Sequence, residues 1–158
     1  MKFLLTIFLF SILFIGCQKN NRNYYSFQDN KWNSKDLIKF NIDVLDSTKK
    51  YSTNIALRHT TSYKFQNIIV FAHQFFNDKK IKTDTLNIFL AEEGGRWLGK
   101  GKGGIKELDY TYKNNTIYRK GKHSFEVELA MRKQDLMEIK ELHNISEISL
   151  YLLEENEK

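Results

Sequence analysis

The sequence contains no proline and only one cysteine among its 158 residues. An average protein of this length would hold about eight prolines at a usage of ~5%, so a Pro-rich linker protein and a collagen-like chain are excluded. One cysteine excludes an intramolecular disulfide and a Cys-based zinc site. Hydrophobic residues still make up 41% of the chain and aromatic residues 14%. This composition excludes a fully disordered protein and is sufficient for one packed domain.

The N-terminus concentrates the hydrophobic residues. Lys2 is followed by an uncharged stretch from Phe3 to Gly16, which would form a helix of about 21 Å at ~1.5 Å per residue. That length is too short for a bilayer core of ~30 Å. A charged start followed by a short apolar run is typical of a secretory signal. We therefore predict a cleaved signal peptide over residues 1–16, in preference to a transmembrane helix or a buried core helix.

The end of this segment indicates lipidation. Phe14-Ile15-Gly16-Cys17 resembles the bacterial lipobox, in which aliphatic residues and a small residue precede the modified cysteine. We predict that Cys17 becomes the lipid-anchored N-terminus and that residues 17–23 form a polar tether; the alternative is a free cysteine after an ordinary signal. Some surface-exported lipoproteins carry acidic residues directly after the cysteine, whereas this chain has none before Asp29. We therefore expect a periplasm-facing position on the outer membrane.

Beyond the tether, apolar and polar residues alternate with a period of two, which is the pattern of half-buried strands. Short strands between turn-rich segments favour an all-β fold, an antiparallel β-sandwich of jelly-roll-like type, as a single domain over residues 24–158. Helix-like spacing occurs only within residues 131–143, where we expect one short helix. The expected strands cover residues 38–44, 51–58, 68–72, 86–90, 125–129 and 148–152, with 68–72 buried on both sides; the expected turns are 46–48, 77–79, 93–95 and 113–115.

No motif in the chain assembles a catalytic, metal or cofactor site. Residues 94–101 follow the P-loop pattern as far as Lys100, but Gly101 stands where Ser or Thr would bind magnesium. The chain has four histidines, and no two of them have the spacing of a metalloprotease motif. No nucleophile elbow or carboxylate pair stands out. We therefore expect a protein that is not an enzyme and that uses no cofactor.

Two basic clusters, Lys79-Lys80-Ile81-Lys82 and Lys100-Gly101-Lys102, contribute to the net charge of +6. Because an exported lipoprotein does not normally meet nucleic acid, we do not expect DNA or RNA as a partner. Solvated loops are the favoured interpretation, with anionic lipid or an acidic partner surface as the alternative. Asp46-Ser47-Thr48 and Asp84-Thr85-Leu86 resemble a short O-glycosylation sequon, and whether either is modified is left open.

An ordered series of short motifs runs from Arg58-His59-Thr60-Thr61-Ser62-Tyr63 through Gly95-Arg96-Trp97-Leu98-Gly99 to residues 126–132, and with the lipobox it covers nearly the whole chain. This series resembles the gliding-motility lipoprotein H (GldH) family. The chain lacks prolines that are common in the family, for example at Lys64, which affects turns rather than strand alternation. The resemblance implies a lipoprotein of the gliding machinery that works beside the type 9 secretion system, without established catalytic residues.

A lipid anchor, a tether and a sandwich without an active site together describe an interaction module of the cell envelope. Its expected partners are the membrane and other envelope proteins of gliding and secretion. Aromatic and arginine side chains are frequent binding hot spots, so the candidate partner-binding residues are Arg58, Tyr63, Trp97 and Arg132. The alternative function is a carbohydrate- or peptidoglycan-binding sandwich, which would present two or more exposed, coplanar rings. The rings available for it are Tyr24, Tyr25, Trp97, Tyr110 and Tyr112.

Overall fold

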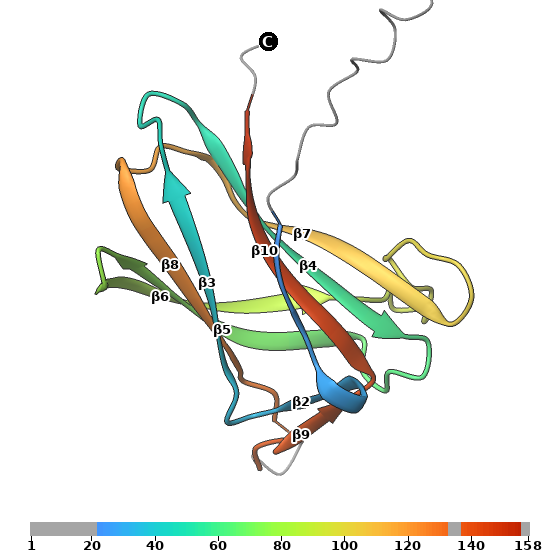
Figure 1. The fold of residues 1–158 in the computed structure, drawn as a ribbon. Coiled ribbons are helices and arrows are strands. Elements are labelled where there is room, and N and C mark those ends of the chain that lie inside the picture. Colours follow the sequence, from blue (N-terminus) through green and yellow to red (C-terminus); the bar gives the residue numbers. More distant parts are fainter. Residues whose placement is uncertain (1–21, 133–136, 156–158) are drawn as a thin grey trace, which may run out of the picture.

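The computed structural model describes residues 22–132 and 137–155, and strands make up most of these ranges (Figure 1). One short 3-10 helix interrupts them near the start of the described chain. In chain order the elements are β1 (Asn23–Ser26), η2 (Gln28–Asn30), β2 (Lys31–Asn33), β3 (Leu37–Val44), β4 (Tyr51–Thr60), β5 (Asn67–Phe76), β6 (Lys79–Phe89), β7 (Ile105–Thr116), β8 (Gly121–Leu129), β9 (Glu141–His143) and β10 (Ile145–Glu154).

Two four-stranded antiparallel sheets form a sandwich, and a two-stranded sheet of β2 and β9 lies at one end. The first sheet has the strand order β1-β10-β4-β7 and the second has β3-β8-β5-β6. When the short β2 and β9 are set aside, the other strands follow the orders 1-8-3-6 and 2-7-4-5 by rank along the chain. This is the arrangement of a jelly roll. The predicted all-β, jelly-roll-like sandwich is therefore confirmed.

Alternation of side chains explains how the two sheets share one core. In β3, Ile38, Phe40 and Val44 are at most 3% exposed, whereas Lys39 and Asn41 between them face solvent. The inner faces of both sheets contribute to a single hydrophobic cluster, as expected for packed sheets. The six strands expected from the sequence coincide with parts of β3, β4, β5, β6, β8 and β10, with only Leu90 falling outside, one residue after β6. These predictions are confirmed.

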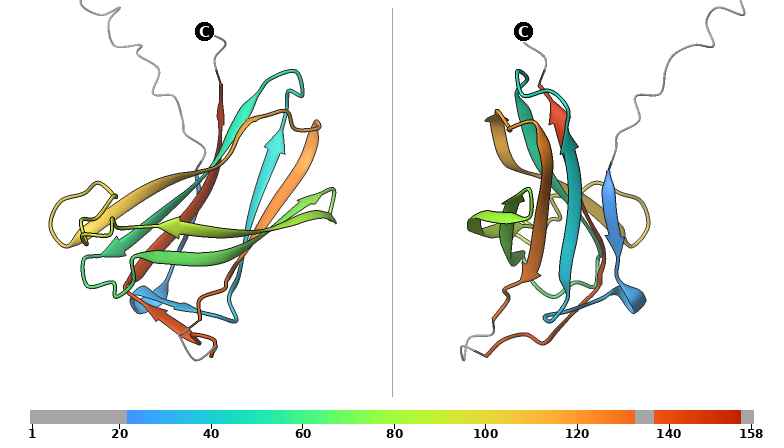
Figure 2. Two further views of the ribbon diagram at one scale, coloured as in Figure 1. Left: turned by 180° about the vertical axis from the view of Figure 1, so that it is seen from behind. Right: turned by 60° about the vertical axis from the view of Figure 1, so that its left-hand side comes forward.

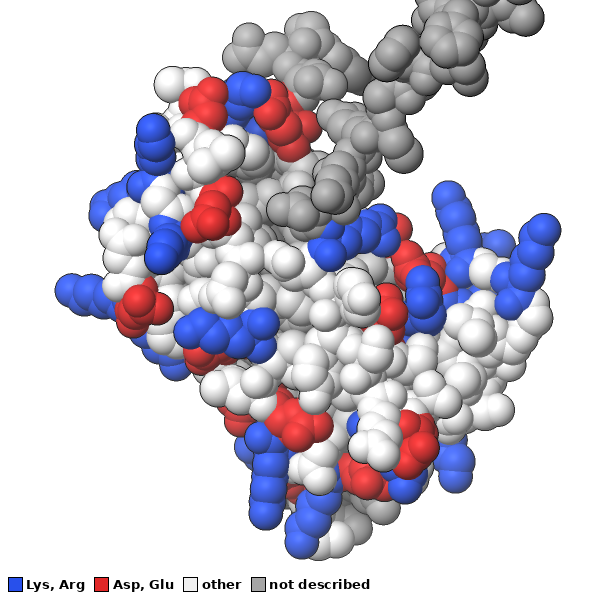
Figure 3. Space-filling view, viewed as in Figure 1, with Lys and Arg blue, Asp and Glu red and all other residues white. Residues whose placement is uncertain are grey.

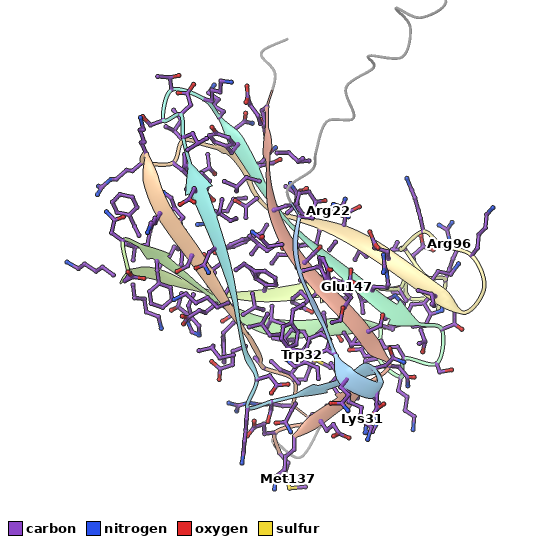
Figure 4. The ribbon with its side chains drawn as sticks, viewed as in Figure 1. Arg22, Lys31, Trp32, Arg96, Met137 and Glu147 are labelled. Atoms are coloured by element: carbon purple, nitrogen blue, oxygen red, sulfur yellow. The ribbon has the colours of Figure 1, made fainter. Side chains whose placement is uncertain are left out.

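The small sheet closes one end of the core. Trp32 of β2 lies opposite Leu142 of β9, and neither side chain is more than 1% exposed. Phe27 stacks on Trp32 with ring centroids 4.8 Å apart. Figure 4 shows Trp32 among the strands and Met137 at the lower extremity of the molecule. Trp32, on the short strand between β1 and β3, thus completes the core from outside the two main sheets.

The helix expected over residues 131–143 is wrong. Glu141–His143 form strand β9, and Arg132 and Glu138 form an isolated antiparallel bridge; residues 133–136 lie outside the described part. Ile139 and Leu142 are buried, at 7% and 1% exposure. Their three-residue spacing suits one face of a helix, but here a turn and a strand bring both side chains into the core.

Two smaller expectations also differ from the structure. Residues 113–115 are not a turn between strands; they lie inside β7, where the pairing with β4 shifts register near Thr53. The run 68–72 is a central strand, but only its alternate residues are fully buried, and Ile69 and Phe71 are partly exposed on the outer face. By contrast, Asn77 and Asp78 do form the β5–β6 turn and both have positive φ, which Asn and Asp tolerate in hairpins.

Candidate functional site: a groove beside Arg58

A groove of about 780 Å³ lies where β4 and β7 meet the long connection between β6 and β7. Both views in Figure 2 show this connection, residues 90–104, projecting beyond the sheets. Leu98 and Ile105 are 43% and 50% exposed in the groove wall. Figure 3 shows basic side chains extending from this side of the molecule. The charged residues that line the groove are Arg58, Lys100, Lys102, Glu107 and Asp109.

Close backbone packing gives the connection its shape. The backbone N–H groups of Lys100 and Glu107 donate to each other's carbonyl oxygens at 2.8 Å. A Cβ atom on Gly99 would lie 2.8 Å from the carbonyl oxygen of Glu107, and one on Gly101 would lie closer still to that of Ile105. These glycines therefore serve the contact between two backbone segments. The antiparallel surroundings agree with the absence of a complete P-loop pattern.

Arg58 forms an ion-pair network that joins three strands of the first sheet. It lies on the outer face of β4, and its Nε and Nη2 atoms donate to Oε2 of Glu107 on β7 at 3.1 and 2.6 Å. Its Nη1 atom donates to Glu147 on β10 at 3.4 Å. The hydrogen bond to Glu107 raises the pKa of Arg58 above its usual value. The groove therefore has a permanently charged and geometrically fixed base.

Arg22 extends the same network toward the N-terminus. Its guanidinium donates to Glu107 at 3.1 Å and to Asp109 at 3.3 Å, and it lies 4.3 Å from the ring centroid of Tyr151. Figure 4 shows Arg22 at the upper end of β1 and Glu147 lower on the neighbouring β10. Arg22, five residues after the predicted anchor, is thus fixed to the sheet that carries the groove.

Beneath this polar layer, a cluster of rings supports the groove from inside. His59 is fully buried, and its ring centroid lies 4.6 Å from that of Trp97 and 5.8 Å from that of Tyr63. Its Nδ1–H donates to the carbonyl oxygen of Thr60 at 2.9 Å. Burial, with a smaller contribution from Lys106, lowers the pKa of His59. The neutral ring therefore acts as a packing element that connects β4 with the 90–104 connection.

The structure distributes the predicted partner-binding residues over different environments. Only Arg58 lines the groove. Tyr63 is 5% exposed and donates its hydroxyl to the carbonyl oxygen of Asn67 at 2.9 Å, and Trp97 packs against the core. Both therefore support the groove wall from behind. Arg132 is exposed after β8, in the other sheet, and is not part of the groove lining. Cys17 lies outside the described residues.

Sequence reasoning missed strand β7 and the functional side chains that it carries. Glu107 and Asp109 are the partners of Arg58 and Arg22, and Ile105 is an apolar part of the groove wall. A signal was present, because the apolar and aromatic residues of β7 alternate with polar ones. These inward-packed residues are Leu108, Tyr110 and Tyr112.

The five rings considered for glycan binding, all in the described part of the chain, do not form a common platform. Trp97, Tyr110 and Tyr112 pack against the core. Tyr24 and Tyr25 are 70% and 43% exposed, but consecutive residues of a strand point to opposite faces. Two exposed, coplanar rings are what the glycan-binding alternative requires, so this geometry gives it no specific support.

A polar cluster joins β6 of the second sheet to β7 of the first. Tyr112 donates to Asp84 at 2.5 Å, Lys82 pairs with Asp84 at 2.9 Å, and Lys113 contacts Gln74. Burial acts to raise the pKa of Asp84, but the hydrogen bonds from Tyr112 and Lys82 outweigh it and the pKa is lowered. Burial and the bond to Asp84 raise the pKa of Tyr112. These charge states suit a connection that holds β6 and β7 together.

Within residues 22–132 and 137–155, no three His, Cys, Asp or Glu side chains converge as a metal site. The same ranges contain no helix that is long and apolar enough to cross a membrane.

Comparison with known proteins decides the family. The family model described as GldH lipoprotein matches residues 19–148. The chain belongs to the GldH lipoprotein family. It is 34% identical over 146 residues to a protein of Christiangramia forsetii named gliding motility lipoprotein GldH homolog, covering 90% of each chain. It is 31% identical over 127 residues to gliding motility lipoprotein GldH of Flavobacterium johnsoniae, covering 80% of this chain and 79% of the relative. No solved structure matches the chain.

Two of the GldH motifs, residues 58–63 and 95–99, lie together at the groove, whereas residues 126–132 lie on and after β8 in the other sheet. Residues 58–63 form the end of β4 and the turn after it, and residues 95–99 form part of the groove wall and its support. Membership of a lipoprotein family implies a lipid-anchored position in the cell envelope. The groove is therefore the region where family resemblance and accessible side chains coincide.

Proposed function

We propose that this GldH-family protein is a component of the bacterial gliding machinery associated with type 9 secretion, and that it acts as a non-catalytic assembly module. The names of the two similar proteins support the role in gliding. The groove beside Arg58 is the observation that carries the binding role. It combines exposed apolar side chains with charges of both signs, and its polar groups are tied into ion pairs rather than aimed at a reacting atom.

The chemistry of the groove indicates the kind of partner segment that it accommodates. Leu98 and Ile105 offer apolar contact area, and Lys100 and Lys102 at the rim favour acidic groups. Arg58 is held in place by two carboxylates before any partner arrives, so little side-chain entropy is lost on binding. We therefore assign the groove to a protein segment that presents an apolar side chain next to acidic ones.

Lipidation of Cys17 is the second part of the proposal. Cys17 precedes Arg22 by five residues, which limits the distance between them to about 18 Å at ~3.6 Å per residue. Because Arg22 contacts Glu107 and Asp109 of the groove lining, the proposed anchor is joined by a short segment to the sheet that carries the groove. A periplasm-facing location on the outer membrane is part of the same proposal, supported by the lack of acidic residues before Asp29.

Site-specific crosslinking in living cells tests the binding role. A photoreactive amino acid at Ile105 is expected to give discrete crosslinks to envelope proteins of the gliding and secretion machinery. The control position is Ile81 on edge strand β6, which is similarly exposed, at 53% against 50% for Ile105, but lies outside the groove. Crosslinks of equal pattern and yield at both positions, or none at Ile105, would contradict the assignment of the groove.

A further inference from the structure

Two loops form one end of the sandwich, and we call them the tip loops. Residues 45–50 connect β3 to β4, and residues 117–120 connect β7 to β8. They lie together because Val44 pairs with Gly121 in one sheet and Tyr51 pairs with Thr116 in the other. In Figure 1 they occupy the upper end of the molecule, opposite β2 and β9.

The tip loops present apolar and basic side chains together. Leu45 is 78% exposed, more than any other exposed large hydrophobic residue in the described part of the chain, and Ile117 is 60% exposed. The same loops contain four basic residues and one acidic residue, Asp46; the basic residues are Lys49, Lys50, Arg119 and Lys120. Glu154 at the end of β10 pairs with Lys49 at 2.6 Å. Apolar side chains surrounded by basic ones are suited to the headgroup region of an anionic bilayer.

The N-terminal segment enters the fold from the side of the tip loops. β1 runs antiparallel to β10, with Asn23 opposite Leu150, and β10 ends at Glu154 opposite Tyr51, the first residue of β4 after a tip loop. Asn23 therefore lies four strand residues below the tip, about 13 Å at ~3.3 Å per residue. Cys17 precedes Asn23 by six residues, a reach of about 20 Å. The chain before β1 is thus long enough to bring its lipid to the level of the tip.

The other surface near the N-terminal segment is less suited to lipid. The outer face of the first sheet holds two arginines, Arg22 and Arg58, against three carboxylates. The carboxylates are Glu107, Asp109 and Glu147. Both arginines are therefore already paired with carboxylates of the same sheet, which leaves their charge less available to anionic headgroups.

We infer that the tip loops rest in the headgroup region of the membrane, with Leu45 and Ile117 as apolar contacts and the surrounding Lys and Arg side chains on anionic lipid. This inference rests on the proposed lipidation of Cys17. It gives the anchored domain a fixed orientation, in which the strands stand away from the bilayer and the end closed by β2 and β9 points into the compartment.

Fluorescence quenching on reconstituted full-length protein tests the orientation. Cys17 is the only cysteine, and lipidation blocks its thiol, so an introduced cysteine becomes the single site for an environment-sensitive dye. Leu45→Cys and Ile117→Cys report on the tip. Tyr24→Cys reports on the face of the first sheet nearest the anchor, and Met137→Cys reports on the opposite end. The protein, purified from membranes, is placed in phosphatidylethanolamine–phosphatidylglycerol vesicles that contain a spin-labelled lipid quencher.

Dye at positions 45 and 117 is expected to be quenched about threefold more than dye at 24 or 137, because only the tip reaches the headgroups. Quenching at 24 that equals or exceeds quenching at 45 and 117 would overturn the inference. So would absent quenching at the tip of a protein that stays bound to vesicles. Dye uptake by the wild-type protein, with loss of vesicle binding, would instead show that Cys17 is not lipidated and would overturn the anchor itself.

Discussion

Arg58 illustrates how a single side chain fixes the groove. Its guanidinium donates to carboxylates on both neighbouring strands. Because the side chain remains 42% exposed, solvent screens much of the attraction between these charges. Arg58→Ala would leave Glu147 without its cation and Glu107 with Arg22 alone. We expect the free energy of unfolding to fall by about 1 kcal/mol, the upper end for an exposed pair, because several charges are linked.

Urea unfolding followed by tryptophan fluorescence measures this loss. Arg58→Lys should recover part of it, since lysine keeps the charge but not the two-pronged geometry. The matched control is Arg96→Ala, because Arg96 pairs only with Glu92 on an exposed turn among the described contacts. A loss in Arg96→Ala as large as in Arg58→Ala would show that the network at the groove is not special.

His59 predicts a pH dependence of stability. Its pKa in the folded protein is lowered by burial, whereas an exposed histidine of the unfolded chain titrates near pH ~6.5. Between these two values the unfolded state binds more protons, so stability falls as the pH drops below about 6.5. Urea midpoints measured across this range should therefore decline more steeply for wild type than for His59→Phe. Parallel declines in the two proteins would contradict the role assigned to His59.

At the scale of elements, the sequence predicted strands whose inner residues are strongly apolar, such as β3 and β10, because such alternation dominates local propensity. It did not predict β7, whose inner face is built mainly of Tyr110 and Tyr112 and whose outer face is charged. It also placed a helix where β9 forms. In both cases the deciding contacts, with β4 and β2, come from residues at least 45 positions away, which local pattern cannot supply.

The residues of the groove were likewise predictable from the sequence only in part. Arg58 was identified from a motif, but its partners Glu107 and Glu147 lie on strands that only the three-dimensional register brings beside it. The basic cluster at 100–102 was identified as solvated loop, and the structure places Lys100 and Lys102 at the groove. The cluster at 79–82 lies on β6, an edge strand, where lysines discourage pairing with other chains.

The 90–104 connection gives a prediction at the same scale. Gly101→Ala should push the connection away from Ile105 and destabilise the protein by about 1–3 kcal/mol, the usual cost of overpacking. Hydrogen exchange should show lost protection at Lys100 and Glu107. Gly94→Ala is the control, because a Cβ there meets no atom within 4 Å. If both variants exchange like wild type, the close approach at Gly101 is not required for the groove.

At the scale of the whole molecule, a jelly roll holds two surfaces in a fixed relation. The first sheet carries Arg22 at the entry of the N-terminal segment and the groove beside Arg58. The tip loops lie at the end of the sandwich nearest the start of β1. Figure 3 shows positive and negative side chains interspersed over the visible face, which is therefore not a uniformly basic surface. We therefore expect binding to depend on the side chains of the groove and of the tip loops rather than on the net charge of the protein.

The most direct test of the account is colony spreading of a strain that lacks this gene and carries a plasmid copy of it. The wild-type copy should restore gliding and display of secreted surface proteins. A copy with Leu98→Asp and Ile105→Asp, which places charge on the apolar groove wall, should accumulate in the membrane to the normal level and yet leave spreading absent. Normal spreading of the deletion strain itself, or full rescue by the groove variant, would contradict the claim that this protein acts in gliding through the groove beside Arg58.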